Sequence, residues 1–178
     1  MGDVSKIQLG VQNIKYGTKD LGHTSGGCEF SYEPEYTDIT VDLYGSTAVD
    51  KVLTGEVVKV TVPLTEVTLD NLKSAIPTGK LIVDGTDPNK KKLTFGSIAG
   101  KKLSASAQEL TLHPSWLGAT DKSFDIVLHK AVIASEVKLE YKKDEQTVYE
   151  VEFFALIDET KTDGNFLASI GDPAIAGA

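Results

Sequence analysis

The 178-residue chain contains no arginine, and its basic side chains are 18 lysines. Arginine is the side chain that holds a phosphate or a guanine edge through two parallel hydrogen bonds. Its absence, together with a net charge of −8, argues against sequence reading of nucleic acid and against binding to an anionic membrane surface. Lysine is also absent between Asp20 and Asp50, a stretch that holds seven carboxylates.

Cysteine occurs once, at Cys28, so a disulfide within the chain is impossible and an oxidising compartment is not required. No apolar run approaches the roughly 18 residues that span a bilayer, and the first residues lack the charged-then-apolar pattern of a signal peptide. We therefore expect a soluble protein made in the cytoplasm, with no membrane partner. With 40% apolar and 25% charged residues, the chain is expected to form a single domain over residues 1–178.

Apolar and polar residues alternate in many short segments, which is the period of a β-strand. These segments, separated by Gly, Pro and Asp turns, lie at residues 6–15, 58–62, 107–112, 124–128, 137–141 and 149–155. The pattern predicts a mainly β fold, an antiparallel β-sandwich or small barrel.

One segment has helical spacing instead. Leu69, Leu72 and Ile76 recur at i, i+3 and i+7, which predicts one flanking α-helix over about residues 65–76. Thr65 or Thr68 can cap its first turn.

Three segments without clear alternation are predicted to lie outside the core. They are a long loop over 45–55, a hairpin insertion over 84–100 with its return strand at 93–95, and a C-terminal arm over 159–178 that packs on this subunit or on a neighbour. All three are candidate assembly elements.

The acid-rich stretch is predicted to form two hairpin-like strands, at 26–33 and 38–44. Because residues of like parity share one face of a strand, Glu29 and Glu33 would lie on one side of the first strand. Asp38 and Asp42 would lie on the matching side of the second. The surface would be purely anionic in front and apolar behind. Residue patterns alone leave two interpretations open: a solvent-exposed face kept soluble by carboxylates, or a functional surface.

The sequence offers few candidates for catalysis or metal binding, and we predict neither an enzyme nor a cofactor. Segment 96–102 departs from a phosphate-binding loop, because three residues rather than four separate its glycines and Lys102 replaces the magnesium-binding hydroxyl. The three histidines share no metal-ligand spacing, so satisfied or exposed histidines are expected rather than a zinc site: His23, His113 and His129. Cys28 is expected to be a small buried residue rather than a nucleophile.

A run of three lysines forms the centre of the predicted hairpin insertion: Lys90, Lys91 and Lys92. Such a run is typical of a solvated hairpin tip. The alternative is a positive contact for an acidic partner surface, including another copy of this chain.

Two stretches resemble the major tail tube proteins of long-tailed, siphovirus-like bacteriophages. The first is TSGG (24–27) followed by DITVDLYGSTAVDKVLTGE (38–56), a valine-rich strand and TEVTLDNL (65–72). The second is ELTLHP (109–114), followed by segments 124–133 and 149–158. The resemblance lies in the order and spacing of these segments, over roughly two-thirds of the chain, rather than in one diagnostic motif.

The resemblance implies a β-sandwich or small barrel whose copies form hexameric rings that stack into a tube for DNA. It implies that the long loop, with Gly45, Asp50, Lys51 and Gly55, contacts the next ring together with the terminal arms. A tape-measure protein, a tail terminator and a distal tail protein are the partners it implies, and the virion tail is the expected location.

A channel for DNA must not hold the duplex, and every lysine or arginine contact to phosphate strengthens binding through counterion release. Double-stranded DNA is therefore expected to pass without specific binding. We predict that a set of carboxylates faces the lumen: Glu29, Glu33, Asp38 and Asp42.

Two alternatives stay open from the sequence. An inner tube of a contractile tail, a secretion-type tube protein or a tail terminator would share the same fold. A β-sandwich module that binds carbohydrate or a host surface would instead require a cluster of exposed aromatic residues, and Trp116 is the single tryptophan.

Overall fold

A computed structural model describes residues 10–96, 99–162 and 164–175. Within this part of the chain, eight strands form one antiparallel sheet in the order β2-β1-β7-β8-β9-β4-β3, and β10 pairs with β8. The strands of this sheet are β1 (Gln12–Tyr16), β2 (Lys19–Asp20), β3 (Glu29–Thr40), β4 (Ala48–Leu64), β7 (Gln108–Pro114), β8 (Ile126–Ile133), β9 (Tyr149–Ala155) and β10 (Ala168–Ile170).

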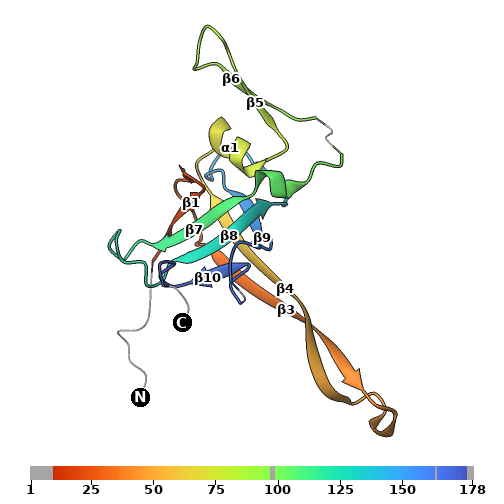
Figure 1. The fold of residues 1–178 in the computed structure, drawn as a ribbon. Coiled ribbons are helices and arrows are strands. Elements are labelled where there is room, and N and C mark those ends of the chain that lie inside the picture. The colour runs from red at the N-terminus through yellow and green to blue at the C-terminus, as the bar shows by residue number, and fades with distance from the viewer. Residues whose placement is uncertain (1–9, 97–98, 163, 176–178) are drawn as a thin grey trace.

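Among the residues that the structure describes, a second hairpin and three short helical segments accompany this sheet (Figure 1). They are the strands β5 (Lys80–Val83) and β6 (Lys91–Thr94), the helix α1 (Leu69–Ala75), and the 3-10 turns η2 (Asp42–Tyr44) and η3 (Leu103–Ser106). The predicted class, mainly β and antiparallel with one flanking helix, is confirmed. The architecture is consistent with a β-sandwich, and the described strands do not close into a barrel.

The core lies on the face that the alternation predicts. Val58, Val60 and Val62 on β4 are buried, whereas Lys59 and Thr61 between them are half-exposed. Neighbouring strands add apolar residues to the same cluster, among them Phe153 on β9. Each such side chain contributes about 1.5–3 kcal/mol when it leaves water, so this cluster holds the sheet together.

Two buried tyrosines keep their hydroxyl groups hydrogen-bonded, as burial of a polar group requires. The Tyr16 hydroxyl lies 3.1 Å from the carbonyl oxygens of both Ala131 and Ser106, which share its single proton, and its ring centroid lies 5.2 Å from that of Phe153. The Tyr149 hydroxyl donates to the carbonyl of Glu66 at 3.1 Å. These bonds connect strands that are far apart in the sequence.

The helix begins directly after Thr68, one of the two threonines that the sequence offered as its cap. The Thr68 side chain accepts a hydrogen bond from the backbone N–H of Asn71, which satisfies one of the unpaired donors of the first turn. α1 is shorter than the predicted 65–76, because Thr65 instead donates its hydroxyl to the carbonyl of His23. The helix packs against the sheet through Leu72 and Ala75, which are buried.

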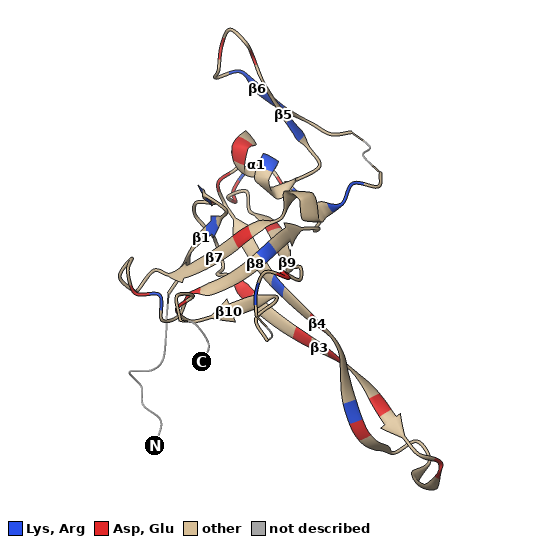
Figure 2. Ribbon diagram, viewed as in Figure 1, with Lys and Arg blue, Asp and Glu red and all other residues tan. Residues whose placement is uncertain are grey.

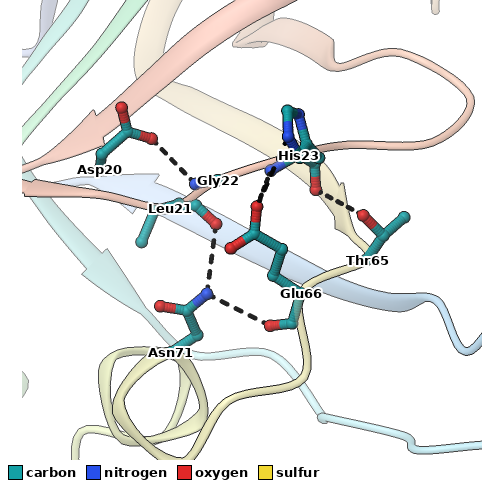
Figure 3. Close-up of polar contacts among 7 residues, drawn as sticks. All are labelled: Asp20, Leu21, Gly22, His23, Thr65, Glu66 and Asn71. Carbon is teal, nitrogen blue, oxygen red and sulfur yellow. Dashed lines mark hydrogen bonds and ion pairs between the residues drawn. The ribbon is translucent and has the colours of Figure 1, made fainter.

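Polar contacts tie the start of the helix to the segment after β2 (Figure 3). The buried Asn71 side chain donates to the carbonyls of Leu21 at 3.4 Å and Glu66 at 3.2 Å. The Glu66 carboxylate accepts from the backbone N–H of His23 at 3.0 Å. Gly22 lies between these partners with φ +82°, a left-handed conformation that favours glycine.

Two predicted boundaries in the acid-rich region are wrong. Segments 26–33 and 38–44 do not pair with each other, because residues 29–40 form the single strand β3, whose partner is β4. The predicted loop 45–55 is also mostly strand, since β4 starts at Ala48. Gly55 suggested a loop but marks an irregularity in register between β3 and β4, which is a common place for a glycine within a strand.

The predicted strand at 137–141 does not form. Its alternation has a different cause: Val137 and Leu139 pack against the core cluster, and Lys138 between them and Glu140 after them are exposed. β8 pairs with β9 only as far as Ile133 and Phe153, and the next N–H of β9, that of Glu152, donates to the Ser135 hydroxyl. The backbone ladder between these two segments therefore ends before residue 137.

The remaining predicted elements are confirmed with shifted ends. The strand expected at 107–112 extends through Pro114 as β7, and the return strand of the hairpin insertion is β6. The early strand is β1, and the predicted residues 6–9 lie outside the described part. Within the predicted C-terminal arm, β10 pairs with β8 of the same subunit, and Leu167 packs against the core. Residues 163 and 176–178 of that arm lie outside the described residues.

Candidate interaction surface

Two hairpins project from opposite ends of the sheet (Figure 1). The first, called the arm below, comprises residues 33–57, the outer parts of β3 and β4 with η2 at the tip. β9 pairs with β4 only from Lys59 onward, so the arm is two strands wide and has no sheet beside it. The second, called the basic hairpin below, comprises residues 80–94, the strands β5 and β6 with their turn.

The arm exposes large apolar side chains at its tip and along its length. At the tip, Leu43 is 82% exposed and Tyr44 is 59% exposed. Further exposed apolar residues lie along both strands: Tyr36, Ile39, Val41, Val49, Val52 and Leu53. A two-stranded ribbon is at best marginally stable in water by itself, and contiguous exposed apolar surface marks a site of contact with another molecule.

The front of the acid-rich strand is not purely anionic, contrary to the sequence prediction. Lys59 lies 2.8 Å from the Glu33 carboxylate and Lys51 lies 2.7 Å from that of Asp38. The hydrogen bond from Lys59, with a second from Ser31, holds the pKa of Glu33 below its ordinary value. β3 contains no lysine of its own, but its partner strand β4 supplies these two cations.

The four carboxylates predicted to line a lumen do not share one face. Glu33 and Asp38 are five residues apart on the continuous strand β3, an odd spacing that places them on opposite sides. Glu29 lies near the body of the sheet, opposite Thr61, and Asp42 lies in η2 at the tip. That these side chains face a channel stays a prediction. Because Glu33 and Asp38 lie on different sides of β3, one face of the strand cannot present all four of them.

Glu152 is a carboxylate that the sequence interpretation missed. Register pairs Glu29 with Thr61 and Thr61 with Glu152, so carboxylates of β3 and β9 flank β4 on one side of the sheet. The hydrogen bond with Glu33 is the main cause of the raised pKa of Lys59, and the charges of Glu152 and Glu29 raise this pKa further. The glutamate alternation in β9 was a visible signal, but only the strand order places it beside β3.

The predicted inter-ring loop residues all belong to the arm. Gly45 follows η2 with φ +60°, which allows the chain to turn back toward β4. Asp50 and Lys51 lie within β4, opposite Ile39 and Asp38. Gly45, Asp50 and Lys51 lie toward the tip of the arm, whereas Gly55 lies within β4 near the base of the arm, opposite Glu35.

The three lysines of the basic hairpin have different surroundings. Lys91 forms an ion pair with Asp70 of α1 at 2.8 Å, which lowers the pKa of Asp70. Lys90 lies 3.7 Å from Asp87 in the turn. No carboxylate within the described residues pairs with Lys92. The three lysines therefore do not form a uniformly solvated hairpin tip, and two of them already have acidic partners in the same chain.

An apolar groove of about 630 Å³ lies where the arm joins the body. Phe30, Tyr32 and Val58 line one side, and Phe166 and Ile170 from the C-terminal segment line the other. The groove extends the exposed apolar surface of the arm onto the body of the protein.

A buried contact between a histidine and an aspartate was not predicted. His113 Nδ1 lies 2.6 Å from Asp125 Oδ1, and the Asp125 side chain is only 5% exposed. His113 is therefore a hydrogen-bonded histidine, and its partner was not foreseen from the sequence. No local pattern indicated this contact: β7 and β8 pair Leu112 with Ile126, and only this register places His113 beside Asp125.

The His113–Asp125 pair has the form of a general base with its orienting carboxylate. Its Nε2 atom is buried, however, and has no hydrogen-bond partner among the described residues, so no hydroxyl or thiol is poised for attack. The pair links β7 to the start of β8. Burial raises the pKa of the Cys28 thiol, which favours the unreactive protonated form.

Among the described residues, no three His, Cys, Asp or Glu side chains gather as a metal ion requires. Within the same residues, no helix has the length and hydropathy needed to cross a membrane. In comparisons with known proteins, the chain matches no protein family and no curated protein.

Proposed function

We propose that this chain is the repeating subunit of a phage tail tube, a structural protein that forms hexameric rings stacked into a channel for DNA. The observation that carries the proposal is the arm: a long two-stranded projection with apolar side chains exposed along its length. Such a surface promotes aggregation of a monomer, whereas in an assembly it can form the contact between subunits. The resemblance in segment order to tail tube proteins supports the same function.

Strand edges supply a second argument. Among the described strands, β3 stands at the end of the sheet order and pairs with β4 alone, so its other edge has backbone donors and acceptors that no described strand pairs. A neighbouring subunit can add a strand there and extend the sheet around a ring. Charged residues and Pro34 on this strand discourage indiscriminate pairing, which favours a specific partner.

Charge supplies a third argument. Net charge is −8, and arginine is absent, so the wall of such a tube would repel the DNA backbone more than hold it. The proposal includes a tape-measure protein inside the tube, terminator and distal tail proteins at its ends, and a final location in the virion tail.

Electron microscopy of the purified protein tests this function. Negative-stain images are expected to show rings or filaments with a central channel, and sedimentation is expected to show mass that rises with concentration. A protein that stays monomeric across the concentration range from micromolar to millimolar would rule the tube out. Affinity for carbohydrate in such a monomer would favour a binding module instead.

A further inference from the structure

The arm and the basic hairpin carry opposite charge and point to opposite ends of the molecule (Figures 1 and 2). The arm holds six carboxylates and one lysine, a net charge of −5. The basic hairpin holds four lysines and two aspartates, a net charge of +2. Two copies aligned end to end would therefore bring a negative projection against a positive one.

One face of the basic hairpin is free for such a contact. Register places Leu81 opposite Leu93 and Ile82 opposite Lys92. Leu93 packs against the core cluster, so its side of the hairpin faces the body. Alternation then places Lys80, Ile82 and Lys92 on the outward face. Among the residues described, neither of these two lysines has an acidic partner, and Ile82 between them is 37% exposed.

The arm carries acidic and apolar residues that complement those of the basic hairpin. Glu33 and Asp38 are neutralised by Lys59 and Lys51, as described above. Glu35, Asp42 and Asp50 are exposed, and no lysine among the described residues pairs with them. Asp42 adjoins the exposed Leu43 at the tip, so the tip combines free negative charge with an apolar side chain. The outward face of the basic hairpin combines free positive charge with an apolar side chain in the same way.

We propose that the arm tip of one copy docks on the outward face of the basic hairpin of the next copy, an inference that rests on the proposed tube. Asp42 and Asp50 would pair with Lys80 and Lys92, while Leu43 would contact Ile82. The contact is head-to-tail, joins two different surfaces, and can repeat indefinitely along an axis. A symmetric arm-to-arm contact is disfavoured because it would oppose two surfaces of charge −5.

Charge-reversed variants test this contact. One variant carries Lys80→Glu with Lys92→Glu, and the other carries Asp42→Lys with Asp50→Lys. Each is expected to raise the concentration needed for assembly by about tenfold or more, because two attractive exposed pairs become repulsive. Lys122→Glu with Lys143→Glu is the charge-matched control, since both residues are exposed and neither forms an ion pair among the described residues.

Mixing the two variants is the decisive step. In an equimolar mixture every arm can meet a hairpin of opposite charge, so assembly is expected to return toward the wild-type concentration. Assembly is followed by sedimentation and by negative-stain microscopy, and circular dichroism confirms that each variant is folded. Added salt is expected to weaken wild-type assembly.

The outcomes separate this contact from the tube itself. If the wild type forms tubes and either variant assembles like it, or the mixture fails to recover, the contact is refuted and the tube stands. If the wild type forms chains without a central channel, yet the swap pattern holds, the contact stands and the tube is refuted. A wild type that never self-associates refutes both.

Discussion

Single residues fix this fold through hydrogen bonds that span large distances in sequence. Tyr149 shows the effect most clearly, because its ring is buried and its hydroxyl donates to the carbonyl of Glu66. The same carbonyl accepts from the Asn71 amide, so β9, the end of β4 and the start of α1 meet at one oxygen atom. Burial raises the pKa of Tyr149 to about 12.

The raised pKa makes stability depend on alkaline pH. A tyrosine whose pKa is higher in the folded state favours folding while it is protonated. That contribution is complete below the unfolded value of about 10 and is lost as pH rises toward 12. Replacing Tyr149 by Phe is expected to cost about 1 kcal/mol at neutral pH and to flatten the fall in stability above pH 10.

Urea unfolding at several pH values between 8 and 11.5 measures both effects, and the difference between wild type and Tyr149→Phe removes the background titration of the lysines. Equal slopes for the two proteins above pH 10 would show that Tyr149 does not carry the dependence.

Ion pairs at the residue scale explain why the acid-rich surface was misjudged. A stretch without lysine is anionic only if its neighbours in space also lack lysine. Glu33 and Asp38 lie opposite β4, which carries Lys51 and Lys59. Composition along the chain could not show this, because strand pairing selects the neighbours.

Elements that form within one short segment of the sequence, such as the helix, were predicted well. The helix could be placed from its apolar spacing, and its cap narrowed to two threonines, because a helix and its cap form within one short segment. The structure chooses Thr68, whose hydroxyl accepts from the Asn71 N–H at 3.1 Å.

Thr68→Ala is therefore expected to lower the free energy of unfolding by about 1 kcal/mol. Thr68→Ser keeps the accepting hydroxyl and is the matched control, with a loss well below that of alanine. Chemical denaturation of the three proteins checks the order. Alanine and serine variants of equal stability would mean that the cap contributes little in this context.

Elements at sheet edges were harder to predict. The alternation at 137–141 satisfied the rule for a strand, but the ladder between β8 and β9 ends at Ile133 and Phe153, where the Glu152 N–H donates to the Ser135 hydroxyl instead of to a backbone carbonyl. The opposite error occurred at 45–55, where flanking glycines suggested a loop. β3, which is 12 residues long, continues from the body into the arm and pairs there with the facing segment, which belongs to a strand of 17 residues.

At the scale of the whole molecule, folding and assembly belong to different parts of the chain. No member of the buried core lies between residues 36 and 54, whereas the exposed apolar residues of the arm are concentrated there. The body should therefore fold without the outer arm.

Excision of residues 36–54 tests this division. Glu35 and Gly55 face each other directly in the register, so an Asn-Gly turn can join them. The free energy of unfolding is expected to stay within about 1 kcal/mol of wild type, while rings and filaments disappear. Urea unfolding and negative-stain microscopy give the two measurements.

The basic hairpin provides the matched control. Val83 and Lys91 are also directly opposite, so the turn between them can be shortened to Asn-Gly while Lys80 and Lys92 are kept. This variant is expected to assemble. Loss of folding on arm excision, or normal tubes without the arm, would contradict the division.

Sequence by itself determined the β class, the buried faces of β4 and β9, and the position of the helix, because alternation, helical spacing and capping are properties of a few consecutive residues. Tertiary structure alone decided which strand lies beside which. That choice neutralised Glu33 and Asp38, placed Glu152 beside β4, joined His113 to Asp125 and left two oppositely charged hairpins at opposite ends. Pairing between distant segments depends on which edges the rest of the fold leaves open, and no local pattern encodes that.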